Sequence, residues 1–124
     1  MKQEVRSKRA PLPVGPYSQA VEAGAIYCSG QIGLDPKTGA LVQGIVAQTR
    51  RVFSNLDEVL RTAGLGLNDV VQTTVFMLDL AEFTEMNEEY SKHFTPPFPA
   101  RTTVQVNALP KGARIAIDAI AVRR

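Results

Sequence analysis

The sequence predicts an α+β domain in which a single sheet carries two helices on one face. Two segments have the 3.6-residue spacing of amphipathic helices, and the segments around them are rich in β-branched residues and bounded by glycine and proline. The predicted order is strands, helix, strand, helix, strands, which favours helices gathered on one side of a sheet. A chain of 124 residues has room for one hydrophobic core, so residues 1–124 are expected to form one domain.

The N-terminal third is expected to contain an edge strand and a hairpin. Residues 18–23 and 25–30 flank Gly24 and are predicted to pair as antiparallel strands, followed by a turn at residues 35–39. Lysine on an edge strand discourages pairing with other chains. We therefore interpret the basic residues near the start as a solvated edge rather than an RNA-binding arm: Lys2, Arg6, Lys8 and Arg9.

The first predicted helix covers residues 46–63. Its apolar residues recur at spacings of three and four and would lie on one face: Phe53, Leu56, Val59, Leu60 and Ala63. Gly64 follows immediately and provides a C-terminal stop.

The second predicted helix covers residues 81–93, with apolar residues at Phe83, Met86, Tyr90 and Phe94. Asp79 is expected to cap its first turn, and Glu82 three residues later would complete a capping box. The prolines within residues 95–99 prevent the helix from continuing.

Three further strands are predicted at residues 70–78, 101–106 and 114–122, with a turn at residues 109–112 between the last two. Some of these strands are apolar at both parities, as in residues 70–71 and 120–122. Two helices cover only one face of a sheet, so we expect the other face to be buried against further copies of the chain.

Composition excludes several classes of function. No apolar run approaches the length of a membrane span, and the N-terminus lacks the apolar block of a signal peptide, which predicts a cytoplasmic protein without membrane contact. With only Cys28 and His93, both interpreted as structural, the chain is expected to bind no metal through a His/Cys cluster. It has no phosphate-binding glycine loop, so no nucleotide cofactor is expected, and a formal charge of +2 without base-stacking aromatics makes nucleic acid an unexpected partner.

One arginine stands out as a candidate binding residue. Arg101 directly follows Phe98-Pro99-Ala100, which fixes its backbone at the start of a strand. Its guanidinium fork matches a carboxylate bidentately, so it could select a small carboxylate substrate. The alternative is a salt bridge at the surface or between subunits.

Six strings in the chain carry a resemblance to a known family. They are GPYSQA, SGQIGLDPKTG, TTVF, FPAR, LPKG and AIAVRR, and together they span residues 10–124. In this order and spacing the chain resembles the RidA/YjgF family of imine deaminases, also called the endoribonuclease L-PSP family. The resemblance implies a chorismate-mutase-like fold with a single mixed sheet, a homotrimer and ligand sites between subunits.

The resemblance also implies an activity, the cofactor-free hydrolysis of reactive enamines and imines to 2-oxo acids and ammonia. Its substrates would be 2-aminoacrylate, 2-iminopropanoate and related 2-imino acids, as expected of a 2-iminobutanoate/2-iminopropanoate deaminase. Arg101 would hold the substrate carboxylate together with the Gly30 amide and the Ser29 hydroxyl, while Tyr17 would line the pocket and Asn87 would lie near it. Arg101, Tyr17 and Ser29 are thus the implied catalytic residues.

The chain departs from the family pattern in its last strand. Deaminase members commonly have two glutamates there, the first of which is expected to hold the attacking water, whereas this chain has Ala116 and Asp118. Alanine offers no side-chain acceptor, and Asp118 would lie roughly 6.5 Å further along the strand. Asp118 is therefore a doubtful water ligand, with a structural carboxylate as its alternative. By strand parity Thr103 would face the same pocket as Arg101, or else would only pack against its neighbours.

Two other functions remain open at this point. A non-catalytic member would keep Arg101, Ser29 and Gly30 and would bind a small 2-oxo or amino acid as a sensor or regulator, which Ala116 favours. Some members of the family have been described as ribonucleases or translation inhibitors. The sequence offers such a function no base-stacking surface and no metal cluster, and any RNA binding should fall steeply with salt.

Overall fold

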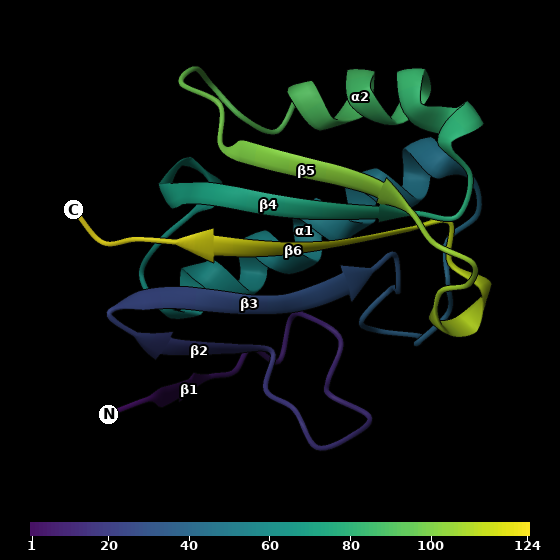
Figure 1. The fold of residues 1–124 in the computed structure, drawn as a ribbon. Helices are drawn as coiled ribbons and strands as arrows, with labels where there is room; N and C mark the ends of the chain where they lie inside the picture. Colours follow the sequence, from purple (N-terminus) through teal and green to yellow (C-terminus); the bar gives the residue numbers. More distant parts are fainter.

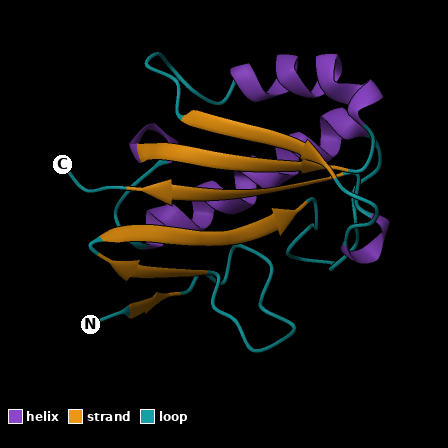
Figure 2. Ribbon diagram, viewed as in Figure 1, coloured by secondary structure: helices purple, strands orange, loops and turns teal.

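The computed structural model describes residues 1–124 as one six-stranded sheet with two α-helices packed on one face (Figure 1, Figure 2). The strands are β1 (Gln3–Val5), β2 (Ala20–Ala23), β3 (Ala25–Ile32), β4 (Val70–Met77), β5 (Ala100–Gln105) and β6 (Ile115–Ala121), and the helices are α1 (Ile45–Thr62) and α2 (Phe83–Ser91). The predicted α+β class, with a single sheet and two helices, is confirmed. No helix has both the length and the apolar composition required to cross a membrane.

The strands follow the order β1-β2-β3-β6-β4-β5 across the sheet. All neighbouring pairs are antiparallel except β4 and β5, which are parallel, so the sheet is mixed as expected. Between β4 and β5 the chain passes through α2, which returns it to the end of the sheet where β4 began. The two strands therefore run parallel. This crossover places α2 beside β5 at one edge of the sheet (Figure 1).

Helix α1 matches its prediction to within one residue at each end. Its apolar stripe packs on the sheet, and Phe53, Leu56 and Leu60 are almost fully buried. The helix ends at Thr62, and Gly64 has a φ of 79°, a left-handed conformation that glycine adopts without strain. The predicted C-terminal stop is confirmed.

The start of α2 differs from its prediction. Leu80–Glu82 form a 3-10 turn, and the α-helix begins only at Phe83 and ends at Ser91. Asp79 caps the 3-10 turn, where its Oδ1 accepts the Ala81 N–H at 2.9 Å. The predicted capping box is wrong, because the Glu82 carboxylate instead accepts a hydrogen bond from Arg114 Nε at 2.6 Å.

The N-terminal segment is tied down by one buried glutamine. The Gln19 side chain accepts the Ser7 N–H at 2.6 Å and donates to the carbonyl oxygens of Ser7 and Pro11. We expected the strand to begin at residue 18, but the Gln19 side chain is used to bind the N-terminal segment, and β2 begins only at Ala20. A strand does form at the sheet edge, β1 beside β2, but the four basic residues flank it as exposed side chains and do not lie within it.

The face of the sheet opposite the helices carries apolar side chains and is covered by nothing within the chain. The strand residues that point toward the helices are buried, including Ile26, Val75 and Ile117. On the other face, Tyr27 and Val104 keep 49% and 38% of their surface exposed. We call this the open face of the sheet; it faces the viewer in Figure 1.

Candidate functional site

Arg101 lies on β5 and points toward α2, where its guanidinium is held in a defined position. Its Nη1 donates a hydrogen bond to Asn87 Oδ1 at 2.8 Å. The guanidinium carbon lies 4.6 Å from the centre of the Tyr90 ring and 5.5 Å from that of Phe83, both within the range of cation–π attraction. We call Arg101, Asn87, Tyr90 and Phe83 the arginine seat.

No carboxylate of the chain pairs with Arg101. The alternative of a surface salt bridge within the chain is therefore wrong, whereas a salt bridge between subunits stays a prediction. Because Asn87 occupies only one of the five guanidinium donors, the others remain able to bind an anionic group. This combination of a fixed position and uncommitted donors suits the recognition of a small carboxylate.

The sequence analysis assigned Tyr90 and Phe83 only to the buried stripe of a helix. Tyr90 does pack in the core, and its hydroxyl forms a 2.7 Å hydrogen bond with Thr73 Oγ1, while burial raises the pKa of its phenol. Its ring face is also part of the arginine seat. Phe83, Asn87 and Tyr90 follow one another at spacings of four and three, and this shared helix face is the signal that could have revealed the seat.

Thr103 lies two residues after Arg101 and on the same side of β5, as strand parity predicted. Its Oγ1 is buried and has no hydrogen-bond partner. Buried hydroxyl groups normally form a hydrogen bond, so this unpaired oxygen two residues after Arg101 is an exception.

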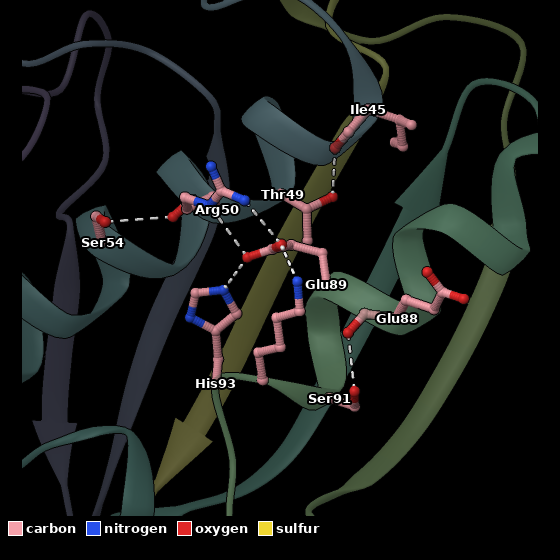
Figure 3. A network of polar contacts seen from close by, with 9 residues as sticks. Ile45, Thr49, Arg50, Ser54, Glu88, Glu89, Ser91 and His93 are labelled. Carbon is pink, nitrogen blue, oxygen red and sulfur yellow. Dashed lines mark hydrogen bonds and ion pairs between the residues drawn. The ribbon is translucent and has the colours of Figure 1, made fainter.

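Helix α2 is anchored to α1 by a buried carboxylate, Glu89 (Figure 3). Arg50 donates to both of its oxygens at 3.1 and 3.2 Å, His93 Nε2 lies 2.8 Å away, and Lys92 Nζ lies 3.6 Å away. The hydrogen bonds from Arg50, the main cause, lower the pKa of Glu89 to about 2. Since His93 also stacks on Phe53, with ring centres 4.6 Å apart, its structural interpretation agrees with its contacts.

Ser29 and Gly30 lie in a bulge of β3. The pairing of β3 with β6 shifts between Cys28 and Gln31, so these two residues have no partners on β6. Such bulges redirect backbone groups away from the ladder. The Ser29 hydroxyl donates to the Ser18 carbonyl oxygen at 2.6 Å, so in this arrangement it offers a ligand only its lone pairs.

Tyr17 lies in the loop before β2, with 51% of its surface exposed. Its backbone N–H donates to the Gly15 carbonyl oxygen at 2.8 Å, and the loop joins the β3 bulge through the bond between Ser18 and Ser29. This bond places Tyr17 in the same part of the structure as Ser29 and Gly30.

The structure divides the predicted site residues into two groups. Arg101, Asn87 and Thr103 gather where β5 meets α2, whereas Ser29 and Gly30 lie on β3, with Tyr17 in the loop bonded to it. Strands β6 and β4 separate β3 from β5, which corresponds to roughly 14 Å at the usual strand spacing. A three- or four-carbon acid cannot contact both groups in one chain.

Ala116 and Asp118 lie on the open face of β6. One oxygen of Asp118 accepts the Thr74 N–H at 3.0 Å, and no cation of the chain pairs with it. Its charge adds to the effect of burial, the larger cause, in raising the pKa of the Cys28 thiol to about 12. Such a thiol is not a nucleophile near neutral pH, in agreement with the structural interpretation of Cys28.

Surface hollows of about 460 and 430 Å³ occur elsewhere on the chain. The first lies among residues 68–71, 95–99, Val122 and Arg124, and the second lies between α1 and the turn after β3. Neither contains Arg101. No three His, Cys, Asp or Glu side chains gather where they could hold a metal ion.

Comparisons with known proteins place this geometry in a family. The model of the family described as endoribonuclease L-PSP matches residues 7–123. Protein DfrA of Myxococcus xanthus is 51% identical over 122 residues, which cover 95% of this chain and 93% of that protein. The 2-iminobutanoate/2-iminopropanoate deaminase of Mus musculus is 46% identical over 121 residues, which cover 96% of this chain and 90% of that protein.

A solved structure extends the likeness to three dimensions. TdcF of E. coli with bound serine superposes with a TM-score of 0.92 at 38% sequence identity, covering 98% of this chain and 99% of that one. The relatives carry different names, so family membership does not by itself specify a reaction. The chain belongs to the endoribonuclease L-PSP family, which is the RidA/YjgF family that the sequence motifs indicated.

Proposed function

We propose that this protein hydrolyses reactive 2-imino acids, and the enamines that tautomerise to them, to 2-oxo acids and ammonia. The observation that carries the proposal is the arginine seat, in which Arg101 is oriented by Asn87 and two aromatic rings without a carboxylate partner. A preoriented guanidinium loses little freedom when it binds, and it matches a carboxylate with two parallel hydrogen bonds. The deaminase name of the mouse relative, at 46% identity, supports the same activity.

The site that we propose is shared between copies of the chain in a homotrimer. Three observations support this arrangement: the two groups of site residues lie too far apart in one chain, the open face keeps Tyr27 and Val104 exposed, and the hollows described above do not include Arg101. In the proposed trimer, Arg101, Asn87 and Thr103 of one copy face Tyr17, Ser29 and Gly30 of its neighbour.

The chemistry requires few groups. Water adds to the imine carbon, the resulting carbinolamine loses ammonia, and the carbonyl of the 2-oxo acid forms. Arg101 fixes the carboxylate next to the reacting carbon, which restricts the geometry of attack. The lone pairs of Ser29 are available acceptors for the water, and either the Tyr17 hydroxyl or solvent supplies the proton for departing ammonia.

A second candidate is a non-catalytic member that binds a small carboxylate. It is favoured by Ala116, which places a methyl group where deaminase members of the family commonly carry the water-holding glutamate. Asp118 is a weak replacement, because one of its oxygens already accepts the Thr74 N–H. The serine bound in the TdcF structure is a ligand of the size and charge that this candidate requires.

The deciding experiment measures 2-oxo acid formation from 2-imino acids that an amino-acid oxidase generates in the assay. We expect the parent chain to accelerate hydrolysis and Arg101→Ala to abolish the acceleration. Arg61→Ala is a suitable control, since Arg61 is an exposed arginine on α1 paired only with Asp57. The molar mass in solution, from light scattering, tests the trimer separately.

The outcomes separate the two candidates. Acceleration by the parent and by Arg61→Ala, but not by Arg101→Ala, would support the deaminase. An inactive parent with an active Ala116→Glu variant would establish the binding-only candidate. Equal loss of activity in both arginine variants would contradict the role of the arginine seat, and a monomeric mass would contradict the shared site.

A further inference from the structure

A second cleft, of about 430 Å³, lies between α1, the segment after β1 and the turn after β3. Its lining contains no hydrophobic residue. The cations are Lys8, Arg9, Lys37 and Arg51, and the carboxylates are Asp35 and Glu58. None of the residues assigned to the shared site lines this cleft, which we call the basic cleft.

The positive charge of the basic cleft is only partly neutralised within the chain. None of its four cations lies within ion-pairing distance of a carboxylate, although Arg50, Arg61, Arg114, Arg123 and Arg124 all have such partners. Four cations and two carboxylates give the cleft a formal charge of +2, which equals the net charge of the entire chain. Such a concentration of one sign in a concave site attracts anions.

Arg51 has a fixed side chain and Lys37 has a fixed backbone before any ligand arrives. Arg51 Nε donates to Asn55 Oδ1 at 3.1 Å, and the buried Asn55 amide donates to the Leu34 carbonyl oxygen at 3.0 Å. The guanidinium plane is thereby fixed while its terminal nitrogens stay free. Lys37 lies in a tight turn that is closed by its own N–H, which donates to Asp35 Oδ1 at 2.8 Å.

The other two cations are carried by an anchored turn. Lys8 and Arg9 lie between the buried residues Ser7 and Ala10, and the Arg9 N–H donates to Ser7 Oγ at 3.1 Å. Ser7 is in turn bonded to the buried Gln19 side chain. All four cations therefore extend from backbone or side-chain positions that are already ordered, which reduces the entropy lost on binding.

We propose that the basic cleft binds a small phosphate-bearing ligand with two or more anionic groups. Four cations exceed what a monocarboxylate requires, and the cleft has the volume of a small-molecule site. Arg51 provides a fork that matches two phosphate oxygens. Because the lining contains no aromatic side chain on which a base could stack, the phosphate groups rather than a nucleobase provide the recognition.

The test is calorimetric titration of the full-length protein with pyrophosphate at low ionic strength. We expect one site per chain, with an affinity that falls by about tenfold or more in Arg51→Gln, since two charge-assisted hydrogen bonds are lost. Arg61→Gln is the matched control: it removes the same charge from the same helix, outside the cleft. Equal weakening by both variants would mean that pyrophosphate senses only net charge and would overturn the proposal.

A gain-of-binding variant guards against misfolding as an explanation. Glu58 lines the cleft and forms no ion pair, so Glu58→Gln should tighten pyrophosphate binding by about two- to fivefold. An unchanged or weaker affinity would contradict the proposal. A short single-stranded RNA forms the last arm: if RNA bound through Arg51 while pyrophosphate did not bind, the cleft would be a nucleic-acid surface and the small-ligand proposal would be wrong.

Discussion

Replacing Glu89 by glutamine should reveal how strongly the buried carboxylate holds α2 in place. Its side chain is only 3% exposed, and it accepts hydrogen bonds from Arg50 and His93. Lowering a carboxyl pKa from 4.5 to about 2 corresponds to about 3 kcal/mol of native-state stabilisation at neutral pH. Because the Arg50 side chain is 59% exposed, water screens the pair, and we expect Glu89→Gln to cost about 1–2 kcal/mol at pH 7.

The pH dependence of this loss identifies its origin. A carboxylate whose pKa is lower in the folded state stabilises the fold fully above the unfolded value of 4.5, and that stabilisation is lost as the pH falls toward 2. The parent and Glu89→Gln should therefore differ most at pH 7 and converge near pH 2. Urea unfolding at pH 7, 4 and 2.5, at one fixed protein concentration, measures the difference.

Glu88→Gln provides the comparison, because Glu88 is an exposed neighbour on α2 whose side chain forms no ion pair. Its stability should stay within about 0.5 kcal/mol of the parent at every pH. The reasoning would be refuted if Glu89→Gln lost the same free energy at pH 7 and pH 2.5, or if it lost no more than Glu88→Gln at pH 7.

Three further substitutions or probes test other parts of the fold. Tyr90→Phe removes the hydroxyl bonded to Thr73 but keeps the ring under Arg101, so it should cost about 1 kcal/mol in urea unfolding; no loss would mean that this bond contributes nothing. Cys28, with a pKa of about 12, should react with a disulfide reagent at pH 8 at least about 100-fold more slowly in the folded protein than in urea, and equal rates would contradict its burial. Gly33→Ala would place a Cβ 2.9 Å from the Gln48 Cα and should lower the unfolding free energy by about 1–3 kcal/mol, whereas an unchanged midpoint would show that α1 can shift.

The sequence predicted the elements better than their arrangement. The apolar spacing of α1 and the glycine after it placed both of its ends within one residue, because those signals are local. The capping box at Asp79 and Glu82 failed because a long-range partner, Arg114, takes the Glu82 carboxylate. The strand predicted from residue 18 starts later because Gln19 bonds the N-terminal segment instead of a neighbouring strand.

The candidate site shows the same division between local and long-range information. The motif around Arg101 indicated a well-held guanidinium, and the structure gives it a defined seat. Strand order and the parallel pairing of β4 with β5 depend on contacts that no single segment encodes, so the separation of Arg101 from Ser29 could not be anticipated from spacing. The helical spacing of Phe83 and Tyr90 predicted only that they are core residues. Their contact with Arg101 depends on the crossover, which places β5 beside α2.

The arginine seat is encoded in a single short stretch of the gene. All four of its residues fall between positions 83 and 101, in the helix and the strand of one crossover, whereas residue 116 lies on a strand that contributes nothing to it. A substitution at residue 116 therefore leaves every contact of the arginine seat unchanged. In evolutionary terms, the seat can be inherited as one unit while the last strand of the sheet changes independently.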